Sequence, residues 1–262
     1  MATGPQQKRK ELRDKRLNAE AASKGVDRRE NMIKIVGVAA FIAIIAIVVA
    51  IVALSGGSDD GSSSKSSSDV TAQLAGIPQN GTILGDPKSD VTLVEFGDMQ
   101  CPICQQYADD VLPDIIGGPI KAGDANLEFK QWAILGEDSS LAGKAALAAA
   151  EQGRYFEFIE TFYADQGLEG SGYVTDDFLT GIAEDAGVED IDKWNVDREA
   201  ADLDQILLMV DNQASELGLT GTPSFAVRGP DGDLTVVQAN STDPQENVKT
   251  LKDAIKEAGG GK

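Results

Sequence analysis

The longest apolar segment of the chain is a run of 20 residues, 35–54, that contains no charged or strongly polar side chain. As an α-helix this run spans about 30 Å, which matches the hydrocarbon core of a bilayer. A buried helix of a soluble domain and a cleaved signal peptide are the alternatives. The apolar region of a signal peptide is usually about 7–15 residues long, and no clear small-x-small cleavage site follows this run. The pattern therefore predicts an uncleaved transmembrane helix.

The charges on either side of this run predict its orientation. Residues 1–34 carry ten Lys or Arg and five Asp or Glu, whereas Lys65 is the one basic residue between 55 and 87. Positively charged flanks remain in the cytoplasm. We therefore expect a cytoplasmic basic tail at 1–34, a single-pass anchor in the cell membrane, and an extracytoplasmic location for everything after residue 54. Residues 55–75 are mostly Ser, Gly and Asp, which predicts a flexible linker.

Beyond the linker, short apolar segments alternate with turn residues and predict one globular domain at 76–258. The expected strands are a short edge strand or turn at 82–84, then 91–96, 127–135, 224–227 and 234–237. The expected helices begin at Ser139 or Ser140, Tyr155, Thr175 and Asp202, and a last helix begins with Asp243 and Pro244. This order predicts an α/β domain with a helical insertion at about 138–218.

The only two cysteines of the chain, Cys101 and Cys104, follow the predicted strand at 91–96 directly. Cys101 is expected at the N-cap of a helix, with Pro102 at the first helical position, where the missing N–H costs nothing. The free N–H groups and the helix dipole then stabilise the thiolate of Cys101, the reactive form of a thiol. The spacing therefore predicts a redox-active pair, located outside the cytoplasm, where disulfides persist.

The composition excludes several other kinds of chemistry. The chain has no histidine, which excludes Ser-His-Asp and Cys-His catalysis, and two cysteines cannot complete a four-ligand zinc site. We expect neither a metal nor a cofactor. A structural disulfide remains an alternative, but closing a loop of about four residues contributes only ~2 kcal/mol; an intermolecular metal site is another. Residues from Ser55 onward carry 13 Lys or Arg and 38 Asp or Glu, which argues against nucleic acid as a partner.

Two motifs resemble those of a known family. The segment Val91–Cys104, with Cys101-Pro102-Ile103-Cys104 at its end, resembles the active-site stretch of DsbA-like thiol–disulfide oxidoreductases, in particular the membrane-tethered versions of Gram-positive bacteria. Gly221–Phe225 resembles the second signature of that family. The resemblance covers roughly residues 76–258. It implies a thioredoxin fold with an inserted helical domain, preceded here by the transmembrane helix and the linker.

The resemblance also implies roles for individual residues. Cys101 is expected to be the exposed nucleophile and Cys104 the buried resolving cysteine, which react through a mixed disulfide. Pro223 is expected to be a cis-proline facing the pair, and Thr222 to offer backbone hydrogen bonds to an extended client peptide. An ordinary proline at the start of a strand is the alternative, since X-Pro bonds are cis in only about 5–6% of folded cases.

Glu95 lies six residues before Cys101, where the family often has a buried acid. Burial would raise its pKa and allow it to relay a proton to Cys104; a solvated strand residue is the alternative. Lys130 is a candidate partner for it.

Pro102 and Ile103 are expected to tune the redox properties of the pair. Isoleucine cannot donate to the thiolate, so the helix terminus would have to provide most of the stabilisation. We expect a Cys101 pKa below the free value of ~8.5 and well above the ~3.5 of the strongest oxidant, which has histidine between its cysteines.

These observations predict a membrane-tethered thiol–disulfide oxidoreductase that oxidises exported cysteine-containing proteins. The expected partners are those proteins, the lipid bilayer through the N-terminal helix, and a quinone-linked membrane protein that reoxidises the pair. A reductase or disulfide isomerase of the same fold is the alternative among enzymes. A tethered chaperone or client-binding module with an incidental cysteine pair is the alternative from another class.

Overall fold

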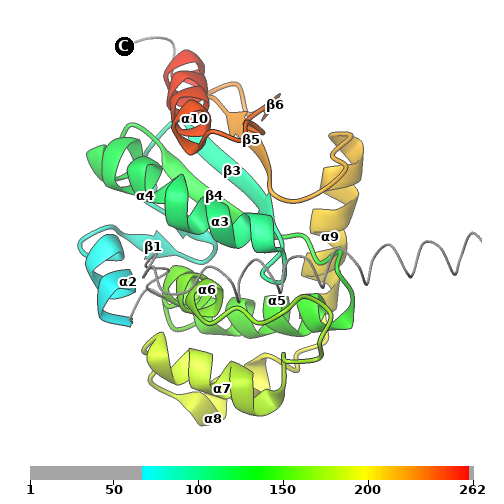
Figure 1. Cartoon of the computed structure of the whole chain (residues 1–262). Coiled ribbons are helices and arrows are strands. Elements are labelled where there is room, and N and C mark those ends of the chain that lie inside the picture. Colours follow the sequence, from blue (N-terminus) through cyan, green and yellow to red (C-terminus); the bar gives the residue numbers. More distant parts are fainter. Residues whose placement is uncertain (1–66, 260–262) are drawn as a thin grey trace, which may run out of the picture. The chain divides into compact units, whose positions relative to one another are not determined.

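The computed structural model describes residues 67–259 of the chain (Figure 1). The elements in chain order are α2 (Ser67–Leu74), β1 (Gln79–Asn80), β2 (Ile83–Leu84), β3 (Thr92–Gly97), α3 (Pro102–Asp110), α4 (Leu112–Ile115), the π-helix η1 (Ile116–Ile120), β4 (Asn126–Gln131), α5 (Glu137–Ala150), α6 (Tyr155–Ala164), α7 (Asp176–Asp185), α8 (Ile191–Asp197), α9 (Asp202–Glu216), β5 (Ser224–Arg228), β6 (Leu234–Val237) and α10 (Pro244–Ala258). Within this range, no helix is both long and apolar enough to span a bilayer. The predicted transmembrane helix at 35–54, the tail at 1–34 and most of the linker lie outside the described residues.

The six strands form one mixed sheet in the order β1-β2-β4-β3-β5-β6. Strand β3 lies between β4, to which it is parallel, and β5, to which it is antiparallel. The remaining pairs are antiparallel, and β5 and β6 form the predicted hairpin. The strand that precedes the cysteines is therefore an inner strand of the sheet, and all six of its residues are buried.

Alternate side chains of β3 point to opposite faces of the sheet, as the pleat requires. Val94 and Phe96 belong to a small apolar cluster that includes Trp132 and, from α9, Val210 and Ala214. The opposite face carries the larger core, to which Leu93 and residues of α3, α6 and α10 belong. The sheet is therefore covered on both sides. Residues of β3 that share a face with Leu93, Glu95 among them, point toward α3, the helix that begins with the cysteine pair.

In the chain, helices α5 to α9 follow β4 and precede β5, where the sequence predicts the helical insertion (Figure 1). The predicted cap of α7 is confirmed, because the Thr175 hydroxyl accepts a hydrogen bond from the Phe178 N–H. The short helix α8 was not predicted. Its Trp194 is completely buried and donates a hydrogen bond to the Ala145 carbonyl, so α8 is held by a long-range contact rather than by a local signal.

Two sequence expectations near the insertion are wrong. Strand β4 ends at Gln131 instead of continuing to Leu135, because the Ile134 and Leu135 N–H groups donate to the Asp98 carboxylate rather than to a neighbouring strand. Neither Ser139 nor Ser140 caps α5, which begins at Glu137 with a glycine at the N-cap.

Two boundaries in the first half of the domain also differ from expectation. The predicted linker at 55–75 overlaps α2 (Ser67–Leu74), whose Val70 and Leu74 are buried in the core, so the folded part begins earlier than residue 76. Strand β2 pairs with both β1 and β4, so it is an inner strand and not the predicted edge strand.

Candidate active site

The two cysteines lie where the inner strand β3 meets helix α3. Cys101 is the N-cap residue of α3 and Pro102 occupies its first turn, as the sequence predicts. The Cys101 N–H donates to the Asp98 carbonyl at 2.9 Å and so closes the turn between β3 and α3. The last residue of β3 is Gly97, and no larger residue fits there, because a Cβ would lie 2.6 Å from the Phe129 ring.

Both cysteines are free thiols in this structure, and they differ in their surroundings. Cys104 is completely buried, and Cys101 retains 6% of its accessible surface. Cys101 is therefore buried, and the expectation that the nucleophile is exposed is wrong. The Cys101 sulfur lies against the Thr222 carbonyl. Pro102 and Ile103, the expected redox-tuning residues, are exposed, and Ile103 retains 50% of its surface.

The surroundings of Cys101 favour its thiolate. A hydrogen bond from the Cys104 thiol is the largest of the effects that lower the pKa of Cys101, to about 6. The Thr222 side chain and the Cys104 and Ile103 N–H groups lower this pKa further, while burial opposes them. The value lies between the two limits expected from the sequence. The expected main cause is wrong, because the Cys104 thiol contributes more than the N–H groups of the helix terminus.

Cys104 has the opposite tendency. Burial raises the pKa of Cys104 well above its ordinary value, and the charges of Cys101 and Glu95 raise it further. At neutral pH the reduced pair therefore holds one proton on Cys104 and one negative charge on Cys101. This is the distribution expected for a nucleophilic cysteine and its resolving partner.

The second motif lies directly against the pair. The Cys101 Sγ lies 3.4 Å from the Thr222 carbonyl oxygen and donates to it as a thiol, although 121 residues separate the two. The Thr222–Pro223 peptide bond is cis, as the resemblance implies. Strand β5 begins at the next residue, Ser224, and pairs with β3 opposite Phe96. Pairing of β3 with β5 thus brings the two motifs together.

Glu95 lies in the middle of β3, between Phe129 of β4 and Phe225 of β5. It is completely buried, and neither of its carboxylate oxygens has a hydrogen-bond partner. Burial, followed by the charges of Glu160 and Cys101, raises the pKa of Glu95 to about 8. The carboxyl group is therefore mostly protonated at neutral pH.

Lys130 is not the partner of Glu95, so that prediction is wrong. Lys130 pairs in register with Phe96, the neighbour of Glu95, and its side chain forms an ion pair with Glu128 at 2.6 Å. The two side chains lie on opposite faces of the sheet, because successive residues of a strand alternate.

Sequence reasoning missed a group of buried and half-buried polar side chains around the cysteine turn. Asp98 is completely buried, and its carboxylate accepts hydrogen bonds from the Gln100 N–H and from the Gln131 amide, in addition to the two N–H groups described above. The Gln166 amide, from the loop after α6, donates to the Met99 carbonyl at 2.6 Å and to the Cys101 carbonyl at 3.2 Å. These contacts attach the helical insertion to the cysteine turn. The adjacency of Asp98 to the motif was the only signal available in the sequence.

A pocket of about 330 Å³ lies beside the pair. Ile103, Tyr107, Thr222, Pro223 and Ala239 are among the residues that line it. Since it adjoins both motifs and has several apolar side chains, it can hold a side chain of a peptide whose cysteine reaches Cys101.

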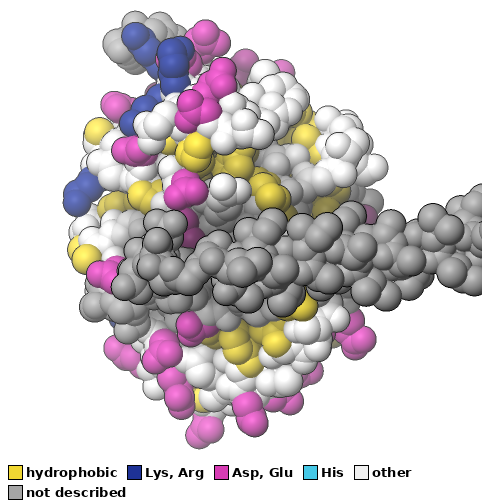
Figure 2. Space-filling view, viewed as in Figure 1, with side chains coloured by type: hydrophobic (Ala, Val, Ile, Leu, Met, Phe, Trp, Pro, Cys, Tyr) yellow, Lys and Arg dark blue, Asp and Glu magenta, His cyan; other side chains and the backbone are white. Residues whose placement is uncertain are grey.

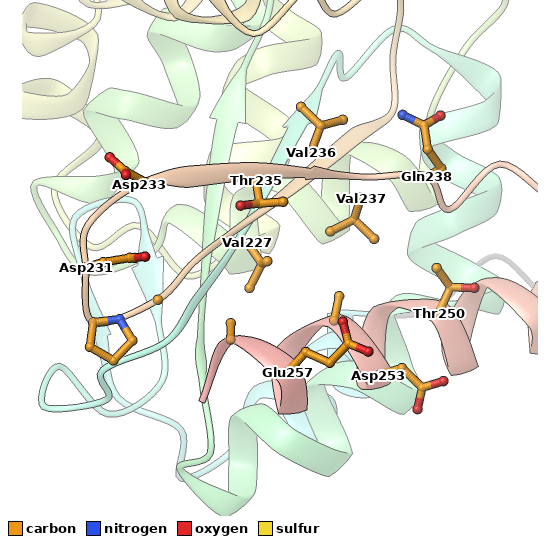
Figure 3. A pocket seen from close by; sticks show the side chains of 14 residues that line it. Val227, Asp231, Asp233, Thr235, Val236, Val237, Gln238, Thr250, Asp253 and Glu257 are labelled. Atoms are coloured by element: carbon orange, nitrogen blue, oxygen red, sulfur yellow. The ribbon is translucent and has the colours of Figure 1, made fainter. Parts of the chain in front are cut away.

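A second pocket, of about 820 Å³, lies between the β5–β6 hairpin and α10 (Figure 3). Asp231 and Asp233 line it from the hairpin, and Asp253 and Glu257 line it from α10. None of its residues is a site residue predicted from the sequence, and it shares none with the cysteine turn. It is therefore not part of the dithiol site.

Comparison with known proteins gives consistent matches. Residues 78–254 match the sequence model of the family described as thioredoxin. The probable disulfide bond formation protein D of Bacillus cereus is 28% identical over 149 residues, which cover 56% of this chain and 69% of that protein. The disulfide bond formation protein D of Bacillus subtilis is 32% identical over 106 residues, 38% of this chain and 46% of that protein.

Solved structures give the same result for the fold. A thioredoxin-like oxidoreductase from Silicibacter pomeroyi is 30% identical, with a TM-score of 0.52 and coverage of 72% of this chain and 96% of that one. Oxidised BdbD from Bacillus subtilis is 23% identical, with a TM-score of 0.58 and coverage of 69% and 97%. Residues 78–254, which match the family model, contain both the cysteine turn and the Thr222–Pro223 segment.

Proposed function

The chain belongs to the thioredoxin family and is a DsbA-like thiol–disulfide oxidoreductase, and we propose on this basis that it is a disulfide oxidase for exported proteins. The observation that carries the proposal is the unequal pair of thiols beside Thr222. Cys101 ionises near pH 6, whereas burial keeps Cys104 protonated. One sulfur is thus ready to attack or to leave, and the other holds a proton until it is needed.

In the proposed reaction, a client thiolate attacks the Cys101 sulfur of the oxidised pair. A bond forms between the client sulfur and Cys101, the Cys101–Cys104 bond breaks, and its electron pair leaves on Cys104. A second client thiolate then attacks the client sulfur of this mixed disulfide, and Cys101 leaves as a thiolate. The client cysteines are oxidised to a disulfide and the enzyme pair is reduced. Another protein must therefore reoxidise the pair before the next cycle.

Glu95 is the proposed proton carrier for Cys104. A buried sulfur holds a negative charge poorly, so Cys104 needs a proton as it leaves the disulfide. Glu95 is protonated at neutral pH, lies on the face of β3 that points toward α3, and has no hydrogen bond that would hold its proton elsewhere. It gives its proton to Cys104 during client oxidation and takes one back during reoxidation.

The apolar pocket beside Pro223 is the proposed client site. Thr222 and Pro223 precede β5 and lie next to the Cys101 sulfur, so an extended client segment can lie along them. An extended segment needs hydrogen bonds for its backbone, and the backbone of Thr222 supplies them in this proposal. Ile103 and Ala239 then contact the client side chains that flank its cysteine.

The low pKa of Cys101 supports oxidation over reduction. A thiolate that is more stable in the reduced protein makes the disulfide a stronger oxidant. A pKa of about 6 lies between the ~7 of thioredoxin and the ~3.5 of the strongest family oxidant, so we expect an oxidase of moderate strength. The alternative, a reductase or isomerase of the same fold, is favoured by Ile103, which offers no donor to the thiolate.

The location remains a proposal from the sequence. The apolar run at 35–54 and the basic residues before it support a cytoplasmic N-terminus and an extracytoplasmic catalytic domain. A membrane protein linked to quinone is the proposed reoxidation partner. Asp and Glu side chains are spread over the face of the domain shown in Figure 2, which favours clients with basic segments over nucleic acid.

Trapping of a mixed disulfide tests the function. In a Cys104→Ser variant, a client peptide with a single cysteine, supplied as its mixed disulfide with thionitrobenzoate, is expected to remain attached to Cys101 while thionitrobenzoate leaves, because neither Cys104 nor a second client thiol can displace the peptide. The Cys101→Ser variant is the matched control and is expected to trap nothing. If the Cys104→Ser variant traps no peptide, the oxidoreductase proposal is wrong. A double Cys→Ser variant that still prevents aggregation of unfolded clients would instead favour the tethered chaperone.

A further inference from the structure

The mechanism above leaves one buried ionisable group near the cysteines without a role. Tyr163 lies at the end of α6 and is fully buried, and its hydroxyl has no hydrogen-bond partner in the protein. Buried polar groups are nearly always paired, so an unpaired hydroxyl in a functional region requires an explanation.

Two side-chain hydrogen bonds hold the end of α6 against the cysteine turn. The Gln105 amide, next to Cys104 in α3, donates to the Tyr163 carbonyl at 2.7 Å. Three residues after Tyr163, the Gln166 amide donates to the Met99 and Cys101 carbonyls. Tyr163 is therefore fixed beside the first turn of α3, on the side of the sheet where α3 and α6 lie (Figure 1).

The charges that act on Tyr163 identify its neighbours. Burial raises the pKa of Tyr163 far above its ordinary range, followed by the charges of Cys104, Glu95, Asp98 and Cys101. Cys104 has the largest effect among these charges, and Glu95 comes next. Since Tyr163 and Cys104 also belong to the same buried core and the Gln105 side chain joins α3 to the end of α6, Tyr163 packs in the region of the two groups that exchange a proton in the proposed mechanism.

The other tyrosines near Glu95 have no free donor. Tyr107 of α3 donates to the Ala239 carbonyl at 2.6 Å, and Tyr155 of α6 donates to the Phe129 carbonyl at 3.2 Å. Both oxygens of Glu95 lack a partner, as the Tyr163 hydroxyl does. Among these tyrosines, Tyr163 has the uncommitted donor, and Glu95 has the uncommitted acceptors.

We propose that Tyr163 is a positioning residue for proton transfer, an inference that rests on the proposed dithiol chemistry. Its hydroxyl donates, through one bound water molecule, to the single negative charge that Glu95 and Cys104 exchange. When glutathione is the oxidant, the Cys104 proton passes to the Glu95 carboxylate. The Cys104 electron pair then forms the bond to the Cys101 sulfur, and glutathione leaves as a thiolate. Tyr163 stabilises the anion before and during this step, and Glu95 later releases the proton to solvent.

The reaction of the reduced full chain with oxidised glutathione separates the two cysteines. The first step, attack by Cys101, depends on the glutathione concentration, whereas the second, attack by Cys104 on the mixed disulfide, does not. Samples are quenched with acid at successive times and the mass of the protein is measured by mass spectrometry. The appearance and the loss of the mixed disulfide then give the rates of the first and the second step. In Tyr163→Phe we expect the second step at pH 7 to be roughly tenfold slower, the loss of one hydrogen bond to a charged group, with the first step changed less than twofold.

The pH dependence of the second step provides a readout that a merely structural role would not change. The charged and ionisable groups that face Glu95 are Glu160 and the tyrosines of α6, Tyr107 of α3, and the two cysteines. In the unmodified chain the rate is expected to rise with pH to an inflection near the Glu95 pKa of about 8. In Tyr163→Phe the carboxylate loses its donor, so the inflection is expected about one pH unit higher.

Two further variants complete the test. Tyr173→Phe is the matched control, because the half-buried Tyr173 ring also packs against Phe162 and Phe178, but neither Glu95 nor a cysteine acts on it; we expect both rates to be unchanged. In a Glu95→Gln background, adding Tyr163→Phe is expected to slow the second step less than it does in the unmodified chain, because only the charge on Cys104 remains to be stabilised; an equal loss in both backgrounds would overturn the inference.

An unchanged second step in Tyr163→Phe, equal slowing of both steps, or the same loss in Tyr173→Phe would overturn the inference and leave the oxidoreductase function intact. If neither a mixed disulfide at Cys101 nor a Cys101–Cys104 disulfide forms in the unmodified chain, the proposed function itself fails.

Discussion

Replacing Glu95 by Gln changes the stability of the reduced protein in a way that depends on pH. Gln is nearly isosteric and cannot ionise, so the variant keeps the shape of the buried side chain and removes its titration. The folded-state pKa of Glu95 is raised from 4.5 to about 8. The fold therefore favours the protonated Glu95 carboxyl, and the free energy of unfolding falls when this carboxyl ionises in the folded protein.

The sign follows from proton linkage. Between pH 4.5 and 8 the unfolded chain has released the Glu95 proton and the folded chain has kept it, so the free energy of unfolding falls as the pH rises. At 1.36 kcal/mol per pKa unit, the loss is about 3 kcal/mol at pH 7 and on the order of 5 kcal/mol above pH 9. Gln avoids this loss but adds a buried amide donor without a partner, which costs about 1 kcal/mol.

We therefore expect Glu95→Gln to be about 1 kcal/mol less stable than the unmodified chain at pH 4.5 and about 2 kcal/mol more stable at pH 7. The assay is urea unfolding of the reduced protein at a series of pH values, followed by the fluorescence of Trp132 and Trp194, both buried in the fold. The difference between the two proteins reports on Glu95 together with its coupling to Glu160 and the cysteines, because distant groups contribute equally to both.

Glu189→Gln, at an exposed position, controls for the loss of one formal charge. A stability difference for Glu95→Gln that does not change between pH 4.5 and 8 would refute the reasoning. So would a variant that is less stable than the unmodified chain at pH 8.

Three further predictions concern the cysteine pair and its support. The rate of Cys101 alkylation should follow a single ionisation near pH 6, and Cys104→Ala should move this midpoint upward, because the thiol that donates to the Cys101 thiolate is missing; an unchanged midpoint would contradict the assigned cause. The reduction potential should fall by about 59 mV per pH unit below the Cys101 pKa and by about 30 mV per pH unit above it, because reduction of the disulfide takes up two protons below this pKa and one above it. A constant slope from pH 5 to 8 would show that Cys101 does not ionise in this range. Gly97→Ala should destabilise the fold by about 1–3 kcal/mol, because its Cβ meets the Phe129 ring, whereas Gly117→Ala, with open space around it, should not; equal midpoints of urea unfolding would be the contrary result.

Local signals in the sequence were sufficient to place the cysteine turn. The N-cap position of Cys101 follows from its place between a buried apolar run and a proline, and the Thr175 and Asp243 caps follow from the same kind of local chemistry. Such features depend on hydrogen bonds between residues two to four positions apart, which a sequence shows directly.

The support of the site could not be read in this way. The Gln131 amide reaches Asp98 and the Gln166 amide reaches the Met99 carbonyl, and these two hydrogen bonds join residues 33 and 67 positions apart in the chain. Glutamines of this kind resemble surface residues in a sequence, and only the packing of α6 against the cysteine turn reveals them as buried supports. Tyr163 lies in the core, and the free donor at its hydroxyl becomes visible only with the neighbouring tyrosines in place.

The reduction potential of the Cys101–Cys104 pair, measured at pH 7 by equilibration of the full chain with reduced and oxidised glutathione, tests the central claim most directly. With a thiolate pKa of about 6, we predict a potential between the roughly −270 mV of thioredoxin and the roughly −120 mV of the strongest family oxidant. A potential at or below about −270 mV would assign the pair to reduction rather than oxidation. A pair that forms no disulfide with itself under any of these conditions would contradict the dithiol site altogether.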